Sequence, residues 1–190
     1  MTRELWDREA ATFDDEPDHG LADPHTRAAW RDLMLDVLPS APARVADLGC
    51  GTGTLTRLLT DEGYTVDGLD HSREMIRRAR VKVPEARFVV GDAARPALAP
   101  HAYDVLLSRH VLWAMPDPAA TFVRWVDLLG ADGTVVLVEG RWESGAGLTA
   151  EECERIVRSV RAEVQVRPLP EPVYWGNAIE DERYLLVSRR

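Results

Sequence analysis

The sequence predicts an α/β fold, in which a doubly wound, mostly parallel sheet carries helices on both faces. The main observation is an alternation of short apolar runs with amphipathic segments over residues 41–190. A glycine-rich turn follows the first apolar run, and an aspartate closes the second, as ligand-binding residues do at the carboxyl ends of parallel strands. Because no internal repeat or low-complexity stretch divides it, we expect residues 1–190 to form one domain.

Residues 1–40 have a different pattern, which predicts helices and loops. Trp6, Ala10 and Phe13 have the spacing of one face of a short helix. The acidic stretch at residues 14–20 predicts a loop, and Asp23 followed by proline predicts the start of a second helix. We expect this segment to cover a site on the core, although the acidic loop is equally well explained as a solvated connector.

The core is expected to contain five strands, each followed by a helix or loop, and then two shorter strands. The five lie near residues 44–48, 64–69, 87–90, 103–107 and 134–138. Helices are expected after the glycine turn, after Ser72, after Asp117 and over residues 148–163. The last two strands are expected near residues 163–167 and 183–188.

Composition excludes several classes of function. The 23 basic residues against 32 acidic ones, a net charge of −9, disfavour binding to a nucleic-acid backbone as the main role. No apolar run approaches the roughly 20 residues of a membrane span, and no signal peptide is evident, so we expect a cytoplasmic protein. Cys50 and Cys153 have no metal-ligand spacing, and Lys82 is the single lysine, which disfavours zinc and Schiff-base chemistry.

The glycine turn, Asp-Leu-Gly49-Cys-Gly51-Thr-Gly53, is the most informative motif. It lacks the lysine of a phosphate-binding loop, and its spacing differs from the G-x-G-x-x-G of dinucleotide sites. Asp47, at the tip of the strand, would repel a pyrophosphate and attract a cation. Gly53 has a second explanation, close packing of the helix that follows.

Two further aspartates are expected at the same edge of the sheet. Asp70 closes the second strand, where a carboxylate can accept hydrogen bonds from both hydroxyls of a ribose. Asp92 follows the third strand, within reach of an adenine amine. Either residue could instead cap the next helix. Three carboxylates around one crevice favour a positively charged adenosine compound without phosphate, such as S-adenosylmethionine.

Together these motifs resemble class I S-adenosylmethionine-dependent methyltransferases over roughly residues 41–140. The resemblance implies a seven-stranded Rossmann-like sheet with its last strand antiparallel. It also implies Asp47 near the methionine amino group, the glycines under the cofactor, Asp70 on the ribose and Asp92 near the adenine. The cofactor-binding residues expected on this basis are Asp47, Gly49, Cys50, Gly51, Gly53, Asp70, His71, Met75, Asp92, Ala93 and Arg109; Met75 is otherwise a core residue.

Aromatic and histidine side chains are the candidates for the methyl acceptor. His110 and Trp113 follow the fourth strand, where similar methyltransferases place acceptor-side groups. His110 is equally well explained as a hydrogen-bonded core residue, and packing explains Trp113 better than a stacking role. The remaining candidates are Trp6, Phe13, His19, Trp142 and Trp175, the last of which could instead brace the final strands. The sequence singles out no catalytic base, and no metal is expected.

The sequence therefore predicts an S-adenosylmethionine-dependent methyltransferase. Its expected acceptor is a small, planar or heteroaromatic molecule, methylated at nitrogen or oxygen. The alternatives are an RNA methyltransferase, a non-catalytic cofactor-binding module and a nicotinamide dehydrogenase. The only support for RNA is a basic stripe, which is better explained as a solvated helix face and consists of Arg77, Arg78, Arg80, Lys82 and Arg87.

Overall fold

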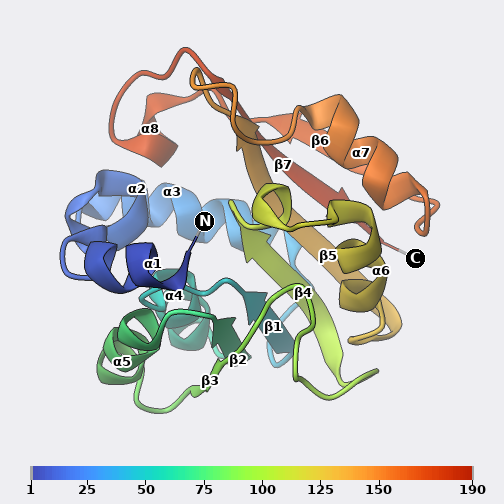
Figure 1. Ribbon diagram of the computed structural model, residues 1–190, viewed down its shortest axis with the longest axis horizontal. Coiled ribbons are helices and arrows are strands. Elements are labelled where there is room, and N and C mark those ends of the chain that lie inside the picture. Colours follow the sequence, from blue (N-terminus) through green and yellow to red (C-terminus); the bar gives the residue numbers. More distant parts are fainter. Residues whose placement is uncertain (1, 190) are drawn as a thin grey trace.

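The computed structural model, which describes residues 2–189, is built on one seven-stranded sheet (Figure 1). The strand order is β3-β2-β1-β4-β5-β7-β6. The strands are β1 (Arg44–Leu48), β2 (Thr65–Asp70), β3 (Arg87–Val90), β4 (Tyr103–Arg109), β5 (Leu129–Arg141), β6 (Gln165–Pro168) and β7 (Glu182–Ser188).

The pairing directions confirm the predicted fold class. Strands β1 to β5 pair in parallel, whereas β7 is antiparallel to both β5 and β6. The chain leaves β1 toward β2 and β3 and returns to the other side of β1 with β4. Strand order thus reverses between β1 and β4, and ligands of open α/β sheets bind in the crevice at such a point.

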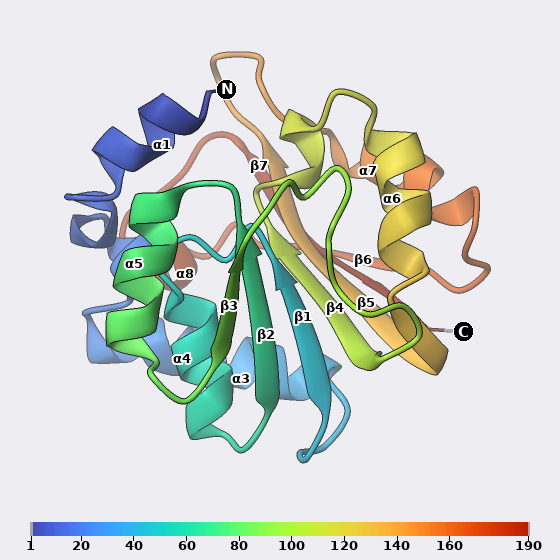
Figure 2. The ribbon, with the colours of Figure 1, turned by 60° about the horizontal axis from the view of Figure 1, so that its bottom comes forward.

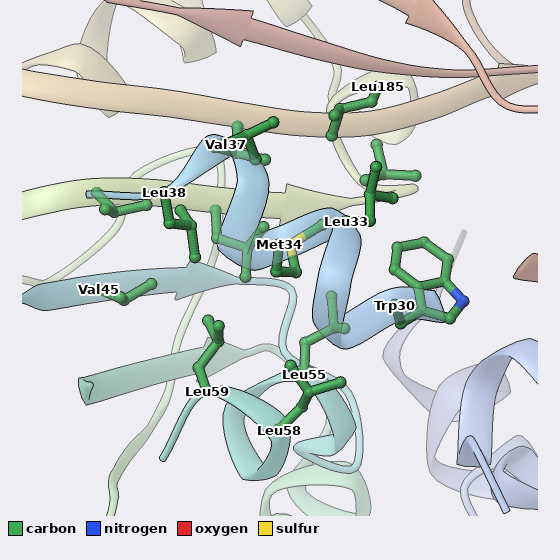
Figure 3. Close-up of a cluster of buried hydrophobic side chains, with 14 of the residues drawn as sticks. Trp30, Leu33, Met34, Val37, Leu38, Val45, Leu55, Leu58, Leu59 and Leu185 are labelled. Carbon is green, nitrogen blue, oxygen red and sulfur yellow. The ribbon is translucent and has the colours of Figure 1, made fainter. Parts of the chain in front are cut away.

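One face of the sheet is covered by α3 (Pro24–Val37), α4 (Thr54–Asp61), α5 (Arg73–Lys82) and α8 (Pro172–Trp175) (Figure 2). Figure 3 shows Trp30, Leu33 and Met34 of α3 in one apolar cluster with side chains of β1, β7 and α4. The predicted helix start is present, because the Asp23 carboxylate accepts hydrogen bonds from the first backbone amides of α3.

The opposite face is covered by α6 (Pro118–Val126) and α7 (Ala150–Arg158), shown in Figure 2. Phe122 and Trp125 of α6 are fully buried against β4 and β5. Cys153 and Val157 of α7 pack against the same cluster. Helix α7 is shorter than expected, since a capping box at Thr149 and Glu152 starts it and its last helical residue is Arg158.

The N-terminal segment lies over the carboxyl end of the sheet. It contains α1 (Arg3–Glu9), the 3₁₀ turn η1 (Phe13–Asp15) and α2 (Pro17–Gly20). The expected single helix through Phe13 was wrong, because α1 ends at Glu9 and the chain turns there. Asp7 holds α1 on α5, where its carboxylate accepts hydrogen bonds from Ser72 Oγ (2.6 Å) and the Glu74 amide (3.2 Å).

Within residues 2–189, no helix is both long enough and apolar enough to cross a lipid bilayer.

Candidate functional site

A cavity of about 350 Å³ opens at the predicted place, the carboxyl ends of β1, β2 and β4. The N-terminal segment forms one wall, and the loop after β4 forms another. Its lining residues are Trp6, Phe13, His19, Asp47, Gly49, Cys50, Gly51, Thr52, Thr54, Leu55, Asp70, His71, Met75, Asp92, Ala93, Arg109, His110, Val111, Trp113, Ala114, Met115 and Trp142.

The glycine turn needs glycine at Gly49 for two reasons. Its φ is +75°, a conformation that residues with a Cβ rarely adopt. A Cβ at this position would also lie 2.2 Å from Cγ2 of Val111. The loop after β4 therefore packs directly on the backbone of the turn.

Gly53, which is expected under the cofactor, is not among the residues that line the cavity. It is the residue before α4, with a φ of +79°, and a Cβ there would lie 3.0 Å from Cβ of Ala79 in α5. Close packing between α4 and α5 explains this glycine, which is the alternative that the sequence left open.

Asp70 connects the glycine turn to the next helix. Its Oδ2 accepts a hydrogen bond from the Gly51 amide (3.0 Å), and its Oδ1 accepts one from the Ser72 amide (2.8 Å). Burial raises the pKa of this carboxyl, and the two backbone bonds act in the opposite direction. The side chain of Ser72, not Asp70, caps α5, since its Oγ accepts from the Met75 amide. Each carboxylate oxygen keeps a second lone pair for a ligand hydroxyl.

Asp92 also lines the cavity but is exposed. Its Oδ1 accepts a hydrogen bond from the Ala94 amide (2.8 Å) and so closes a local turn. No helix starts at this position, so the helix-cap alternative was wrong.

Asp47 is the most deeply buried carboxylate in the cavity wall, with 3% of its surface exposed. Its Oδ2 accepts a hydrogen bond from Oγ1 of Thr56 (2.7 Å). Burial raises its pKa to about 6 and the negative charge of Asp70 adds to the effect, whereas Thr56 and Arg109 oppose it. A bound cation would remove much of the cost of keeping this carboxylate ionised.

Arg109, at the end of β4, provides positive charge opposite these acids. Its Nη1 donates a hydrogen bond to the carbonyl oxygen of Asp18 (2.5 Å), and its guanidinium lies 5.2 Å from the centre of the Trp30 ring. The N-terminal segment is thereby tied to β4 beside the cavity.

A second tie involves the single lysine, which the sequence analysis left without a role. The Lys82 ammonium pairs with the Asp14 carboxylate (2.8 Å) and donates to Oγ1 of both Thr52 (3.0 Å) and Thr54 (2.8 Å). Because Asp14 belongs to η1, this group of contacts holds the N-terminal segment against the glycine turn.

Aromatic rings form the rest of the cavity wall. In the N-terminal segment, Phe13 stacks on His19 with their ring centres 4.1 Å apart. Across from them, the edge of His110 meets Trp142 (5.2 Å) and Trp113 lies 5.1 Å from Trp142. Burial lowers the pKa of both histidines, most strongly for His110, so both imidazoles are neutral at pH 7.

Trp175, an expected substrate-binding residue, is not among the residues that line the cavity. It is 4% exposed, packs on Trp30 and His110, and donates a hydrogen bond from Nε1 to the Leu169 carbonyl. It supports His110 from behind, which agrees with the alternative bracing role.

Sequence reasoning missed several lining residues, because nothing in their type marks them. They are Thr52, Thr54, Leu55, Val111, Ala114 and Met115. Thr52 and Thr54 lie in or beside the glycine turn, so proximity to the motif was an available signal. Leu55 is the second residue of α4, next to the same turn, and Val111, Ala114 and Met115 depend on how the loop after β4 folds back.

Among residues 2–189, no group of three or more histidine, cysteine, aspartate or glutamate side chains is arranged to hold a metal ion.

The fold and the cavity together define a class of protein. A seven-stranded sheet with an antiparallel β7, a glycine turn at the switch point, and acidic residues at the carboxyl ends of β1, β2 and β3 are the features of a class I methyltransferase. The residues fit S-adenosylmethionine chemically, because the buried Asp47 is matched to a cation and Asp70 offers acceptors for a ribose.

Comparisons with known proteins agree with this class of protein. Residues 46–137 match the family model described as "Methyltransferase domain". A trans-aconitate 2-methyltransferase from Variovorax paradoxus is 35% identical over 82% of this chain and 56% of its own length. One of the same name from an Azoarcus species is 40% identical over 57% of this chain and 43% of its own length. The chain thus spans about half the length of these curated relatives.

Solved structures share the fold at lower sequence identity. A Thermotoga maritima protein described as a methyltransferase, possibly for histamine, has a TM-score of 0.78 at 16% identity and covers 99% of both chains. An S-adenosylmethionine-dependent methyltransferase from Mesorhizobium loti has a TM-score of 0.70 at 20% identity, over 87% of this chain and 98% of its own. The match over residues 46–137 and the relatives thus support a class I S-adenosylmethionine-dependent methyltransferase, and the solved structures show the same fold.

Proposed function

We propose that this protein transfers the methyl group of S-adenosylmethionine to nitrogen or oxygen of a small, planar, uncharged molecule. The observation that carries the proposal is a single cavity with two chemically different ends. Carboxylates and the glycine turn line one end, and aromatic rings with neutral imidazoles line the other. We also take residues 1–190 as one domain, with residues 1–40 covering the site.

The cofactor end is assigned to residues around the glycine turn. Asp47 and Asp70 would hold the amino group and the ribose, and Asp92 would lie near the adenine. Cys50, Gly51, His71, Met75 and Ala93 complete this surface, and Arg109 suits the carboxylate of the methionine portion. When bound, the cofactor supplies an electrophilic methyl group on a sulfonium sulfur.

The acceptor end is assigned to His110, Trp113 and Trp142, together with Phe13 and His19 of the N-terminal segment. Aromatic rings on several sides of the cavity favour a planar methyl acceptor, since stacking and edge contacts between aromatic rings are attractive. The same rings exclude water and restrict the orientation of the guest, which is a main source of acceleration for an in-line displacement. A neutral imidazole can accept a hydrogen bond from an N–H or O–H group of the acceptor.

A second candidate acceptor is a small carboxylic acid, which the names of the curated relatives support. Arg109 is the one permanently cationic side chain among the described residues that line the cavity. Because Arg109 already contacts Asp18 and Trp30, we favour an uncharged acceptor.

Calorimetry and a labelling experiment test the proposal. Purified protein should bind S-adenosylhomocysteine and should give no heat with NAD. With methyl-labelled cofactor and a cell extract, label should enter small, uncharged aromatic metabolites. Label in trans-aconitate or similar acids would support the second candidate, and label in RNA would support a nucleic-acid substrate. Binding without any transfer would instead support a non-catalytic module.

A further inference from the structure

Glu139 is a buried carboxyl group that the proposed chemistry does not use. It lies near the end of β5 with none of its surface exposed, opposite Tyr184 of β7. Along β5, Val135 and Leu137 belong to the apolar cluster that α6 and α7 cover, and Glu139 follows at the same two-residue spacing. In the part of the chain that the structure describes, Glu139 forms no ion pair.

The carboxyl group contacts the loop after β4. Its Oε1 accepts hydrogen bonds from the backbone amides of Val111 (3.1 Å) and Leu112 (2.7 Å). These amides follow His110, whose φ of +59° turns the chain at this point. The other oxygen, Oε2, is buried and has no hydrogen-bond partner within residues 2–189.

This loop joins the two ends of the cavity. Val111 packs on Gly49 of the glycine turn, as the 2.2 Å approach of its Cγ2 to a Cβ at that position shows. On the other side of Val111, His110 lies against Trp142 and Trp175. The indole of Trp113 donates a hydrogen bond to the His110 carbonyl (3.0 Å), which ties the two acceptor-side residues together.

We propose that Glu139 is a positioning residue for the methyl acceptor, because it fixes the loop that carries His110 and Trp113. The inference deepens the proposed function and rests on it. An apolar side chain in its place would leave two backbone amides without an acceptor, and buried amides without partners are costly. A purely structural role in the cluster would be served better by a hydrocarbon, since an isolated buried carboxyl is costly as well.

The ionisation of Glu139 provides a readout that simple packing would not. Burial raises its pKa to about 8, and the bonds from Leu112 and Val111 only partly offset this. The titratable groups facing it are Cys153 on α7, whose pKa is raised to about 12, and Tyr184 on β7, whose pKa is also raised. Both are neutral below pH 9, as is His110 on the loop. Above pH 8, a charged carboxylate favours loop arrangements that expose it to water.

The test compares Glu139→Leu and Glu139→Gln with the wild type, using Cys153→Ala as the matched control. Cys153 is buried in the same cluster and forms no hydrogen bond to the loop. For Glu139→Leu we expect the KM for the acceptor to rise about tenfold or more, while the Kd for S-adenosylhomocysteine changes less than about twofold. Glu139→Gln should keep the wild-type KM at pH 7, because its amide oxygen can accept the same two bonds. Above pH 8 the wild-type KM should rise and that of Glu139→Gln should not.

Hydrogen exchange gives a readout that does not depend on methyl transfer. The amides of Val111 and Leu112 should exchange faster in Glu139→Leu than in the wild type, and at the wild-type rate in Cys153→Ala. If no acceptor is ever methylated, the proposed function fails while this exchange result still tests the role of Glu139. Unchanged exchange, equal effects on KM and cofactor Kd, or an equal effect of Cys153→Ala would overturn the inference. If Glu139→Leu does not fold, the pH profile of Glu139→Gln decides.

Discussion

Asp47→Asn should make the ligand-free protein more stable and make it bind the cofactor less tightly. The two effects have one physical origin, a carboxylate held in a buried wall of the cavity without a fully compensating cation. The asparagine has nearly the same size and can still accept the hydrogen bond from Thr56. Charge is therefore the main property that the substitution changes.

The gain in stability follows from the raised pKa of Asp47. An increase from the ordinary value of 3.8 to about 6 corresponds to about 3 kcal/mol at pH 7. Because the folded-state pKa is the higher one, the stabilising effect of the bound proton is complete below pH 3.8 and is lost as the pH rises through 6. The difference between Asp47→Asn and the wild type should grow over this window and stay constant above it.

The loss of affinity follows from the contact with a positively charged group. A hydrogen bond between charged groups contributes about 1.5–3 kcal/mol, which corresponds to a loss of about 10- to 150-fold in affinity. Below pH 6 the wild type should lose affinity as well, by up to tenfold per pH unit, because binding must then displace a proton from Asp47. The variant should not show this dependence.

Calorimetric titration with S-adenosylhomocysteine and urea denaturation, each at pH 5, 6, 7 and 8, measure both effects. Asp132→Asn is the control and should change neither, because Asp132 is an exposed carboxylate near the amino end of β5, whereas the cavity lies at the carboxyl ends of the strands. The reasoning is refuted if Asp47→Asn binds as tightly as the wild type at pH 8, or if it loses stability at that pH.

Three further predictions concern the turn, the N-terminal segment and β5. Gly49→Ala should lose about 2 kcal/mol of stability and at least about tenfold in affinity for S-adenosylhomocysteine, because a Cβ there meets Val111 at positive φ. Gly145→Ala, also at positive φ but with open space around it, should lose only stability, and a calorimetric titration distinguishes the two. Lys82→Met should speed hydrogen exchange of residues 3–20, because it removes the contacts to Asp14, Thr52 and Thr54. The control Arg77→Met, which removes an ion pair with Glu74 within α5, should leave this exchange unchanged. Equal exchange in the two variants would contradict the prediction. Relative to Glu139→Gln, the wild type should lose about 5 kcal/mol of stability in urea denaturation as the pH rises from 4.5 to 8, because folding raises the pKa of Glu139 from 4.5 to about 8. Parallel stability curves for the two proteins would argue against this.

The sequence determined the features of this protein that depend on neighbouring residues. Strand β1 was predicted to its exact bounds, because five largely apolar residues run directly into a glycine turn. Asp47 and Asp70 were predicted at the edge of the cavity, since parallel strands bring their carboxyl ends together whatever the details of packing. Positive φ at Gly49 and Gly51 is likewise a local property of the turn.

The tertiary structure decided everything that depends on which distant segment lies next to a residue. Gly53 faces Ala79 and Trp175 faces Trp30, so neither reaches the cavity, and no local pattern distinguishes these residues from Gly51 or Trp142. Lys82 meets Asp14 across 68 positions of the chain, and Glu139 meets a loop that precedes it by 27 or 28 residues. Hydrophobic periodicity predicts which side of a helix or strand is buried. The hydrophobic effect is not directional, however, so periodicity does not predict which distant segment packs against that side.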